Sequence, residues 1–175
     1  DYTNASFLVS KDFKLPGDNE GVFSGLQGTK SQEGIVNGKY DKATWAFQKD
    51  DKGNPKQDMT LQDPQCVLQL LKKHYSRYTI DKVVEITGTP KEKLLEVYSA
   101  YAKTGKPDKA GTVMYAMGYT QHTVGVQNIR AASIIQSLLG NIGRPGGGIL
   151  ALRGHSTIQG STDVPTLYNL LPGYL

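Results

Sequence analysis

The sequence holds a single cysteine, Cys66, among its 175 residues. One thiol excludes a disulfide within the chain and any cysteine-rich metal cluster built from it. Cys66 lies beside Val67, Leu68, Leu70 and Leu71. The sequence therefore predicts a buried helix thiol, because free cysteine is commonly buried.

Long apolar runs are missing as well. No stretch comes near the roughly 20 apolar residues that cross a bilayer. The first residues do not have the pattern of a signal peptide. The sequence therefore predicts no direct membrane insertion.

An excess of one charge is present but mild. The net charge is +4 and the isoelectric point about 9.0, which raises nucleic acid as a partner. The lysines of the first 110 residues are dispersed among Asp and Glu, with no basic stripe and no aromatic stacking motif. A solvated surface is favoured and no nucleic-acid partner is expected; nucleic-acid binding stays the weaker alternative.

Residues 1–62 are predicted to form a loop-rich strand and hairpin region without chemistry of its own. Short strands are expected over 7–9 and 45–48, separated by a stretch with many glycines. Such spacing is typical of loops and of one hairpin.

Residues 63–110 are predicted to form a small helical region. Asp63 before Pro64 suggests a capping side chain and a proline at the first helical position. A second helix is expected over 79–86 with its end at Gly88, and Thr89 opens a third with a capping-box pattern.

Residues 111–175 are predicted to be an α/β segment. The run 112–117 is apolar and partly β-branched, and Gly118 closes it, which favours a buried strand. Tyr119 and Gln121 would then lie past the carboxyl end of that strand, where open α/β sheets bind their ligands.

A helix is expected over 123–139, because apolar residues recur there at helical spacing. Gly140-Asn141 supplies its end. The predicted apolar stripe consists of Ala131, Ile134, Ile135, Leu138 and Leu139.

A glycine-rich turn follows the helix. Its members are Gly143, Pro145, Gly146, Gly147 and Gly148. A chain of this kind turns sharply and exposes backbone N–H groups, which suits the close approach of a large polyanionic ligand.

Arg153 stands between the apolar run 149–152 and Gly154. A planar guanidinium suits a small carboxylate, since it offers two parallel charge-assisted hydrogen bonds. His155 has no second His, Cys or carboxylate at ligand spacing, so no metal ligand is predicted in this chain.

Three segments in this order carry a resemblance to a known family: MGYTQH, GNIGRPGGG and ALRGHSTIQGSTD. They resemble the catalytic subunit of the respiratory formate dehydrogenases, in the molybdopterin oxidoreductase (dimethyl-sulfoxide-reductase-like) family. RGHS followed by QGSTD is the specific part. The likeness extends upstream through YTNASFLV and YDKATWAFQ and downstream to NLLPGYL, so it covers nearly the whole chain.

The resemblance implies roles for eight residues. By resemblance Arg153 aligns with the arginine that orients formate beside the metal, and Thr162 with a hydroxyl of the substrate pocket. The remaining six resemble residues that contact the cofactor from two sides: Gly118, Tyr119, Gln121, Gly154, His155 and Gln159.

The implied fold is α/β, part of a dimethyl-sulfoxide-reductase-like multidomain fold. Small helices precede a strand, a turn, a helix and a glycine-rich cofactor loop. Residues 111–175 then form the part that binds cofactor and substrate. The family's catalytic subunits are several times longer, so the chain is expected to be an internal fragment that is inactive alone.

The implied reaction is the reversible two-electron oxidation of formate to carbon dioxide. In the family, molybdenum or tungsten is held by two molybdopterin guanine dinucleotides and by selenocysteine or cysteine. That ligand and the ligands of a [4Fe-4S] cluster are expected elsewhere in the subunit. The expected partners are the rest of the catalytic subunit and an iron-sulfur electron-transfer subunit. The resemblance is to exported forms of anaerobic respiration, so a periplasmic location is expected.

Two alternatives remain open. One is another molybdopterin oxidoreductase, of the nitrate or polysulfide type, which RGHS with QGSTD disfavours. The other is a non-catalytic anion- or nucleotide-binding domain. The turn GNIGRPGGG disfavours it, because it matches neither the G-x-G-x-x-G nor the G-x-x-x-x-G-K-[ST] fingerprint.

Overall fold

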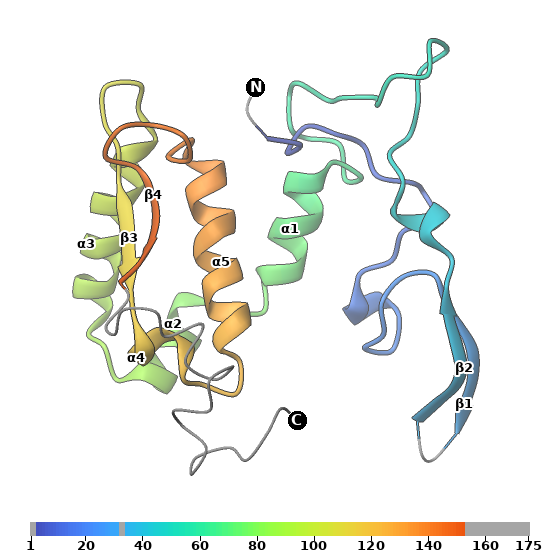
Figure 1. Cartoon of the computed structure of the whole chain (residues 1–175), viewed down its shortest axis with the longest axis horizontal. Coiled ribbons are helices and arrows are strands. Elements are labelled where there is room, and N and C mark those ends of the chain that lie inside the picture. Colours follow the sequence, from blue (N-terminus) through green and yellow to red (C-terminus); the bar gives the residue numbers. More distant parts are fainter. Residues whose placement is uncertain (1–2, 32–33, 153–175) are drawn as a thin grey trace, which may run out of the picture. The chain divides into compact units, whose positions relative to one another are not determined.

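The computed structural model describes residues 3–31 and 34–152. The chain divides into two compact units, Asp1–Ala100 and Tyr101–Leu175, whose elements are labelled in Figure 1. Helices and strands both occur, so the predicted α/β character is confirmed. The finer division at residues 62 and 110 stays a prediction.

The first unit begins with single β-bridges where the sequence predicted strands over 7–9 and 45–48. Val9 pairs with Phe47 in one antiparallel bridge. Its neighbours pair with other segments, so no continuous ladder forms. The second predicted strand starts inside a 3-10 helix, η2 (Lys42–Trp45).

The glycine-rich stretch contains the predicted hairpin. Strands β1 (Leu26–Ser31) and β2 (Gly34–Tyr40) pair antiparallel. Gly25 precedes β1 with φ +77°. A Cβ on this glycine would collide with the carbonyl oxygen of Asp41, and the N–H of Asp41 donates to the Gly25 carbonyl at 2.8 Å. Only glycine allows this close approach at a positive φ.

Three helices follow, as predicted. They are α1 (Val67–Tyr75), α2 (Ile80–Thr87) and α3 (Lys91–Ala102). The Thr79 hydroxyl accepts a hydrogen bond from the Lys82 N–H at 3.3 Å and caps α2, which ends at Gly88 with φ +69°.

The predicted start of α1 is wrong. Asp63 and Pro64 form a turn before the helix, in which the Asp63 carboxylate accepts the N–H of Gln65 at 2.7 Å. Cys66 occupies the N-cap position with extended backbone, because it forms an antiparallel bridge with Leu8. The predicted burial of its thiol is confirmed.

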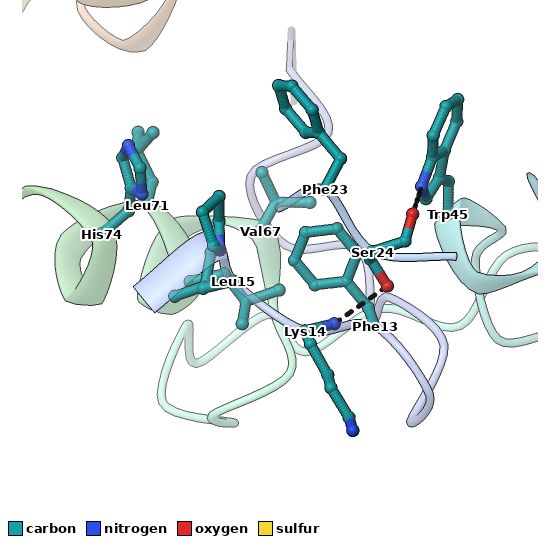
Figure 2. Close-up of a pocket in the computed structure, with 11 residues that line it drawn as sticks. Phe13, Lys14, Leu15, Phe23, Ser24, Trp45, Val67, Leu71 and His74 are labelled. Carbon is teal, nitrogen blue, oxygen red and sulfur yellow. Dashed lines mark hydrogen bonds between the residues drawn. The ribbon is translucent and has the colours of Figure 1, made fainter. Parts of the chain in front are cut away.

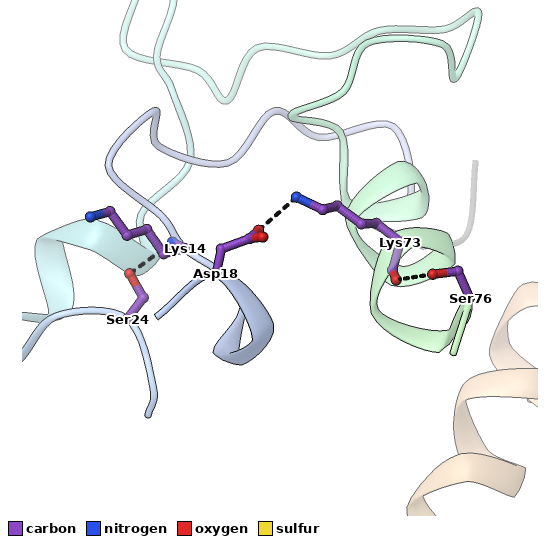
Figure 3. Close-up of polar contacts among 5 residues, drawn as sticks. All are labelled: Lys14, Asp18, Ser24, Lys73 and Ser76. Atoms are coloured by element: carbon purple, nitrogen blue, oxygen red, sulfur yellow. Dashed lines mark hydrogen bonds and ion pairs between the residues drawn. The ribbon is translucent and has the colours of Figure 1, made fainter. Parts of the chain in front are cut away.

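A short 3-10 helix, η1 (Pro16–Asp18), is tied to α1 by one ion pair. Figure 3 shows the Asp18 carboxylate 2.6 Å from the Lys73 ammonium, and the Lys73 carbonyl accepting the Ser76 hydroxyl. Both charged groups are about half exposed, so water screens the pair, and its stabilisation is below about 1 kcal/mol.

The second unit is a strand–helix–strand arrangement. Strand β3 (Thr112–Tyr115), helices α4 (Met117–Thr120) and α5 (Gly125–Leu138), and strand β4 (Gly148–Ala151) follow one another. A 3-10 helix, η3 (Lys103–Gly105), precedes them. β3 and β4 are parallel, and α5 packs against β4 (Figure 1). A parallel pair needs such a crossover connection.

The predicted strand 112–117 is two residues too long. The chain turns helical at Met117, and Gly118 lies inside α4 instead of closing the strand. The carbonyl of Ala116 accepts the N–H of Tyr119 at 3.1 Å and the hydroxyl of Thr120 at 2.9 Å. These two bonds turn the backbone into a helix directly after the last residue that pairs with β4.

The buried face of α5 also differs from the predicted stripe. Ile135 is 48% exposed and Leu138 is 43% exposed. The buried residues are instead Gly125, Ala132 and Gln136. The predicted end of the helix is confirmed, since Gly140 has φ +67°.

None of the described helices combines the length and the apolar character that spanning a bilayer requires.

Candidate functional site

β3 and β4 end beside each other. Tyr115 is paired with Ala151 in the parallel register. The next residue, Leu152, donates its backbone N–H to the Tyr115 carbonyl at 2.8 Å. The chain therefore leaves both strands at the same carboxyl edge, where parallel sheets bind ligands.

Three predicted cofactor contacts lie at this edge, on or next to α4. Gly118 is exposed, and a Cβ added to it would meet no atom within 4 Å. Tyr119 is half-buried, and its hydroxyl donates to the Asn128 carbonyl at 2.9 Å. The exposed Gln121 side chain makes no hydrogen bond to any described residue. Gly118 thus leaves open space beside its backbone and Gln121 offers an amide without a described partner, whereas the Tyr119 hydroxyl is engaged inside the unit.

His122 lies against the same turn. Its Nε2 is 2.9 Å from the Gly118 carbonyl oxygen. A carbonyl only accepts hydrogen bonds, so Nε2 carries the proton and donates. This contact holds the turn that contains Gly118.

The other predicted site residues lie outside the described part of the chain. They are Arg153, Gly154, His155, Gln159 and Thr162. The catalytic pair Arg153 and Thr162 and these cofactor contacts stay predictions. β4 leads directly into this segment at the edge that carries α4.

The chain's own packing accounts for part of the glycine-rich turn. Gly143, Gly146 and Gly148 have φ of +79°, +77° and +99°, a region that glycine reaches without strain. A Cβ on Gly147 would collide with the carbonyl oxygen of Asn141. The sequence pattern that indicated a ligand therefore also serves a close backbone approach.

A buried polar cluster, which the sequence analysis missed, lies behind this turn. Gln136 and Asn141 are both 0% exposed, and the Asn141 Nδ2 donates to the Gln136 Oε1 at 3.0 Å. The sequence signal for this cluster was Gln136, a polar residue among the apolar residues that recur along α5. Asn141 was interpreted only as part of the helix end.

The first unit contains an apolar pocket of about 440 Å³, drawn in Figure 2. Phe13, Phe23 and Trp45 lie on one side and α1 on the other. The polar groups of Ser24 and Trp45 are paired with the chain itself: the Ser24 carbonyl accepts the Trp45 indole N–H at 2.7 Å, and the Ser24 hydroxyl accepts the Lys14 N–H at 3.1 Å. This pocket offers apolar surface and no reactive constellation.

Within residues 3–31 and 34–152, no group of three or more His, Cys, Asp or Glu side chains is placed to hold a metal ion.

Curated relatives align with almost the whole chain. It is 58% identical over 174 residues to the formate dehydrogenase subunit alpha of Megalodesulfovibrio gigas. The chain matches a segment of formate dehydrogenase alpha and major subunits. It is 53% identical over 173 residues to formate dehydrogenase 2 subunit alpha (cytochrome c-553) of Nitratidesulfovibrio vulgaris. With the nitrate-inducible formate dehydrogenase major subunit of Escherichia coli the identity is 52% over 174 residues.

Each of these alignments covers 99% of the chain but only 16% of the relative. The chain thus spans about one sixth of the length of the formate dehydrogenase subunits that it matches. No protein-family model matches the sequence.

Proposed function

We propose that this chain is the part of a formate dehydrogenase catalytic subunit that binds the cofactor and formate. One observation carries the proposal: 99% of the chain aligns at 58% identity with a formate dehydrogenase subunit alpha. A dimethyl-sulfoxide-reductase-like multidomain fold belongs to the proposal, on the resemblance of the glycine-rich turn and of the RGHS and QGSTD motifs.

The geometry of the second unit supports this function. The turn around Gly118 and the sequence that begins at Arg153 both follow the carboxyl ends of paired parallel strands. Ligands of α/β proteins bind at such an edge. Two separate stretches of sequence are therefore available to one ligand.

The described residues fit a molybdopterin guanine dinucleotide. Such a ligand is large, anionic and rich in hydrogen-bonding groups. Gly118 leaves open space beside its backbone, and the Gln121 amide is free among the described residues to donate or accept. Gly154, His155 and Gln159 would contact the ligand from the second stretch.

In the proposed reaction formate loses its C–H bond and yields carbon dioxide, one proton and two electrons. The bound molybdenum or tungsten pterin centre supplies the electron-accepting chemistry. Arg153 holds the formate carboxylate through two parallel hydrogen bonds and so orients the C–H bond, and the Thr162 hydroxyl lines the pocket. The positive charge of Arg153 also compensates the negative charge of formate.

The proposal includes partners and a location. The names subunit alpha and major subunit of the relatives imply further subunits. By the same resemblance the electrons pass to a [4Fe-4S] cluster in the remainder of the catalytic subunit and then to an iron-sulfur subunit. The periplasm is proposed because the resemblance is to exported respiratory forms, and cell fractionation of the native complex tests it.

The decisive experiment compares Arg153→Lys with the unchanged protein, in the complete native enzyme. Lysine keeps the charge but loses the planar pair of donors. We expect kcat/KM for formate to fall about 10²-fold, since misplaced substrates commonly cost that much. The metal content should stay unchanged, because the side chain is proposed to contact formate.

Three outcomes would each contradict a part of the proposal. Unchanged formate oxidation with Arg153→Lys would show that Arg153 does not bind the substrate. Reduction of nitrate or polysulfide by a native enzyme that does not oxidise formate would place the chain in another molybdopterin oxidoreductase. Nucleotide binding with no pterin in the native protein would favour a non-catalytic domain.

A further inference from the structure

Among the described residues of the second unit, Gln136 has the most completely hydrogen-bonded side chain. It lies in α5 and is 0% exposed. A glutamine amide has two N–H donors and one oxygen with two acceptor sites. All four are used here, so the side chain is held in a single orientation.

The donors of Gln136 join the two strands at their amino ends. Its Nε2 donates to the Gly111 carbonyl at 2.8 Å and to the Gly148 carbonyl at 2.5 Å. Gly111 immediately precedes β3, and Gly148 is the first residue of β4. Because Thr112 is paired with Gly148 in the sheet, one amide spans both strands where their pairing begins.

The acceptor of Gln136 is fixed from the other side. Its Oε1 accepts the Tyr101 hydroxyl at 2.6 Å and the Asn141 Nδ2 at 3.0 Å. Asn141 in turn accepts the Gly111 N–H at 3.1 Å and donates to the Thr104 hydroxyl at 2.9 Å. Burial raises the pKa of Tyr101, which keeps its hydroxyl protonated as a donor.

This cluster bears on the register in which β4 pairs with β3, which the two strands alone specify only weakly. β3 and β4 have four residues each, and two short apolar strands can pair in more than one register. A shift by one residue turns every side chain to the other face of the sheet, and a shift by two moves the strand by roughly 7 Å. A leucine in place of Gln136 would fill the space but would not choose a register.

We propose that Gln136 is a positioning residue. Its amide fixes β4 on β3, and thereby sets where the sequence that begins at Arg153 starts relative to the turn at Gly118. This inference rests on the proposed function of those two stretches. Gln136 acts through the strands and touches neither cofactor nor substrate.

The test uses Gln136→Met in the complete native enzyme. Methionine keeps the approximate length and removes both donors and the acceptor. The matched control is Gln127→Met, the same change at an exposed position of α5. Three quantities are measured: amide hydrogen exchange over residues 148–152, metal and pterin content, and the KM and kcat of the cofactor-loaded fraction.

With Gln136→Met we expect amide exchange over 148–152 to rise at least tenfold. The KM for formate should rise about tenfold or more at the same cofactor content, because a displaced arginine binds the carboxylate less well. Gln127→Met should leave all three quantities unchanged. Tyr101→Phe, which removes one bond to Oε1, should raise both exchange and KM by a smaller factor.

Several results would overturn the inference. Exchange over 148–152 that stays within twofold of the native rate would show that the amide does not fix β4. A variant that loses cofactor or thermal stability, while its loaded fraction keeps the native KM, would reduce Gln136 to a structural residue. If Gln136→Met does not fold, unchanged exchange and KM with Tyr101→Phe would overturn it equally.

Failure of this inference can be told apart from failure of the proposed function. If the native enzyme does not oxidise formate, the proposed function has failed, and hydrogen exchange still shows whether Gln136 holds the strands. If Arg153→Lys impairs formate oxidation while Gln136→Met does not, only the positioning role is lost.

Discussion

The backbone N–H of Leu152 donates to the carbonyl of Tyr115 at 2.8 Å. This bond lies one residue beyond the named end of β4 and is the last described contact before Arg153. It places the two strand exits at one edge, so the α4 turn and the segment after Leu152 start as neighbours although they are distant in sequence.

The exposed amide of Gln121 is expected to serve a ligand. Gln121→Ala removes a side chain with no described partner, so the stability of the protein should change by less than about 0.5 kcal/mol. A lost hydrogen bond to the pterin cofactor should weaken its retention about fivefold, which corresponds to about 1 kcal/mol. Pterin released from the purified native enzyme measures this. Gln127→Ala on α5 is the control, and equal pterin content in both variants would contradict the assignment.

Tyr119 is expected to hold the turn through its hydroxyl. Tyr119→Phe removes the donor to the Asn128 carbonyl but keeps the ring, whose centroid lies 5.8 Å from that of Tyr115. Local stability should fall by about 1 kcal/mol, seen as faster amide exchange around residues 117–121. Pterin content should stay at the native level. Loss of pterin without faster exchange would mean that the hydroxyl serves the cofactor directly.

Gly147 is expected to tolerate no side chain. In Gly147→Ala the new Cβ would collide with the Asn141 carbonyl oxygen, so the glycine-rich turn must shift, at a cost of about 1–3 kcal/mol. Thermal unfolding of the native enzyme and amide exchange over residues 140–148 measure the loss. Gly17→Ala is the matched control, since a Cβ there would meet no atom within 4 Å. Equal stability of the two variants would show that the turn can shift to accept the Cβ without a loss of stability.

Local signals in the sequence predicted the helix ends well. Gly88 and Gly140 were expected to end helices, and both adopt a positive φ there. Such an end depends on the backbone freedom of one residue, so sequence alone can reveal it. The helix start predicted from Asp63-Pro64 was wrong, because the same pair suits a turn as well as a helix start. The bridge between Cys66 and Leu8 decided between them, and no local pattern contains that pairing.

The site was less accessible to sequence reasoning than the helices. The resemblance supplied Arg153 and Gly118 as site residues, but it gave no reason to look at Gln136. The partners of Gln136 include Gly111, 25 positions earlier in the chain, and only the fold brings them together. For the same reason the predicted apolar stripe of α5 is wrong. The polar Gln136 lies on the buried face of the helix, and Ile135 is exposed.

The carboxylate of Asp58 is expected to make the stability of its loop depend on pH. It accepts the Thr60 hydroxyl at 2.6 Å and the N–H groups of Asp63, Thr60 and Gln62 at 2.7–2.9 Å. These bonds, the Thr60 hydroxyl first, lower the pKa of Asp58 from 3.8 to about 2. A lowered pKa means that the folded loop favours the ionised form, so its stabilisation is present above about pH 4 and is lost as the pH falls through about 2.

Asp58→Asn tests this dependence, because an amide cannot ionise and turns one acceptor into a donor that faces two N–H groups. Amide exchange of Thr60, Gln62 and Asp63, corrected for the intrinsic rate, should be faster in the variant from pH 7 down to pH 4. The difference between variant and native enzyme should shrink as the pH approaches 2. Asp51→Asn is the control, since Asp51 makes no hydrogen bond to another described residue through its side chain. A difference that stays constant down to pH 2 would mean that the charge of Asp58 does not hold the loop.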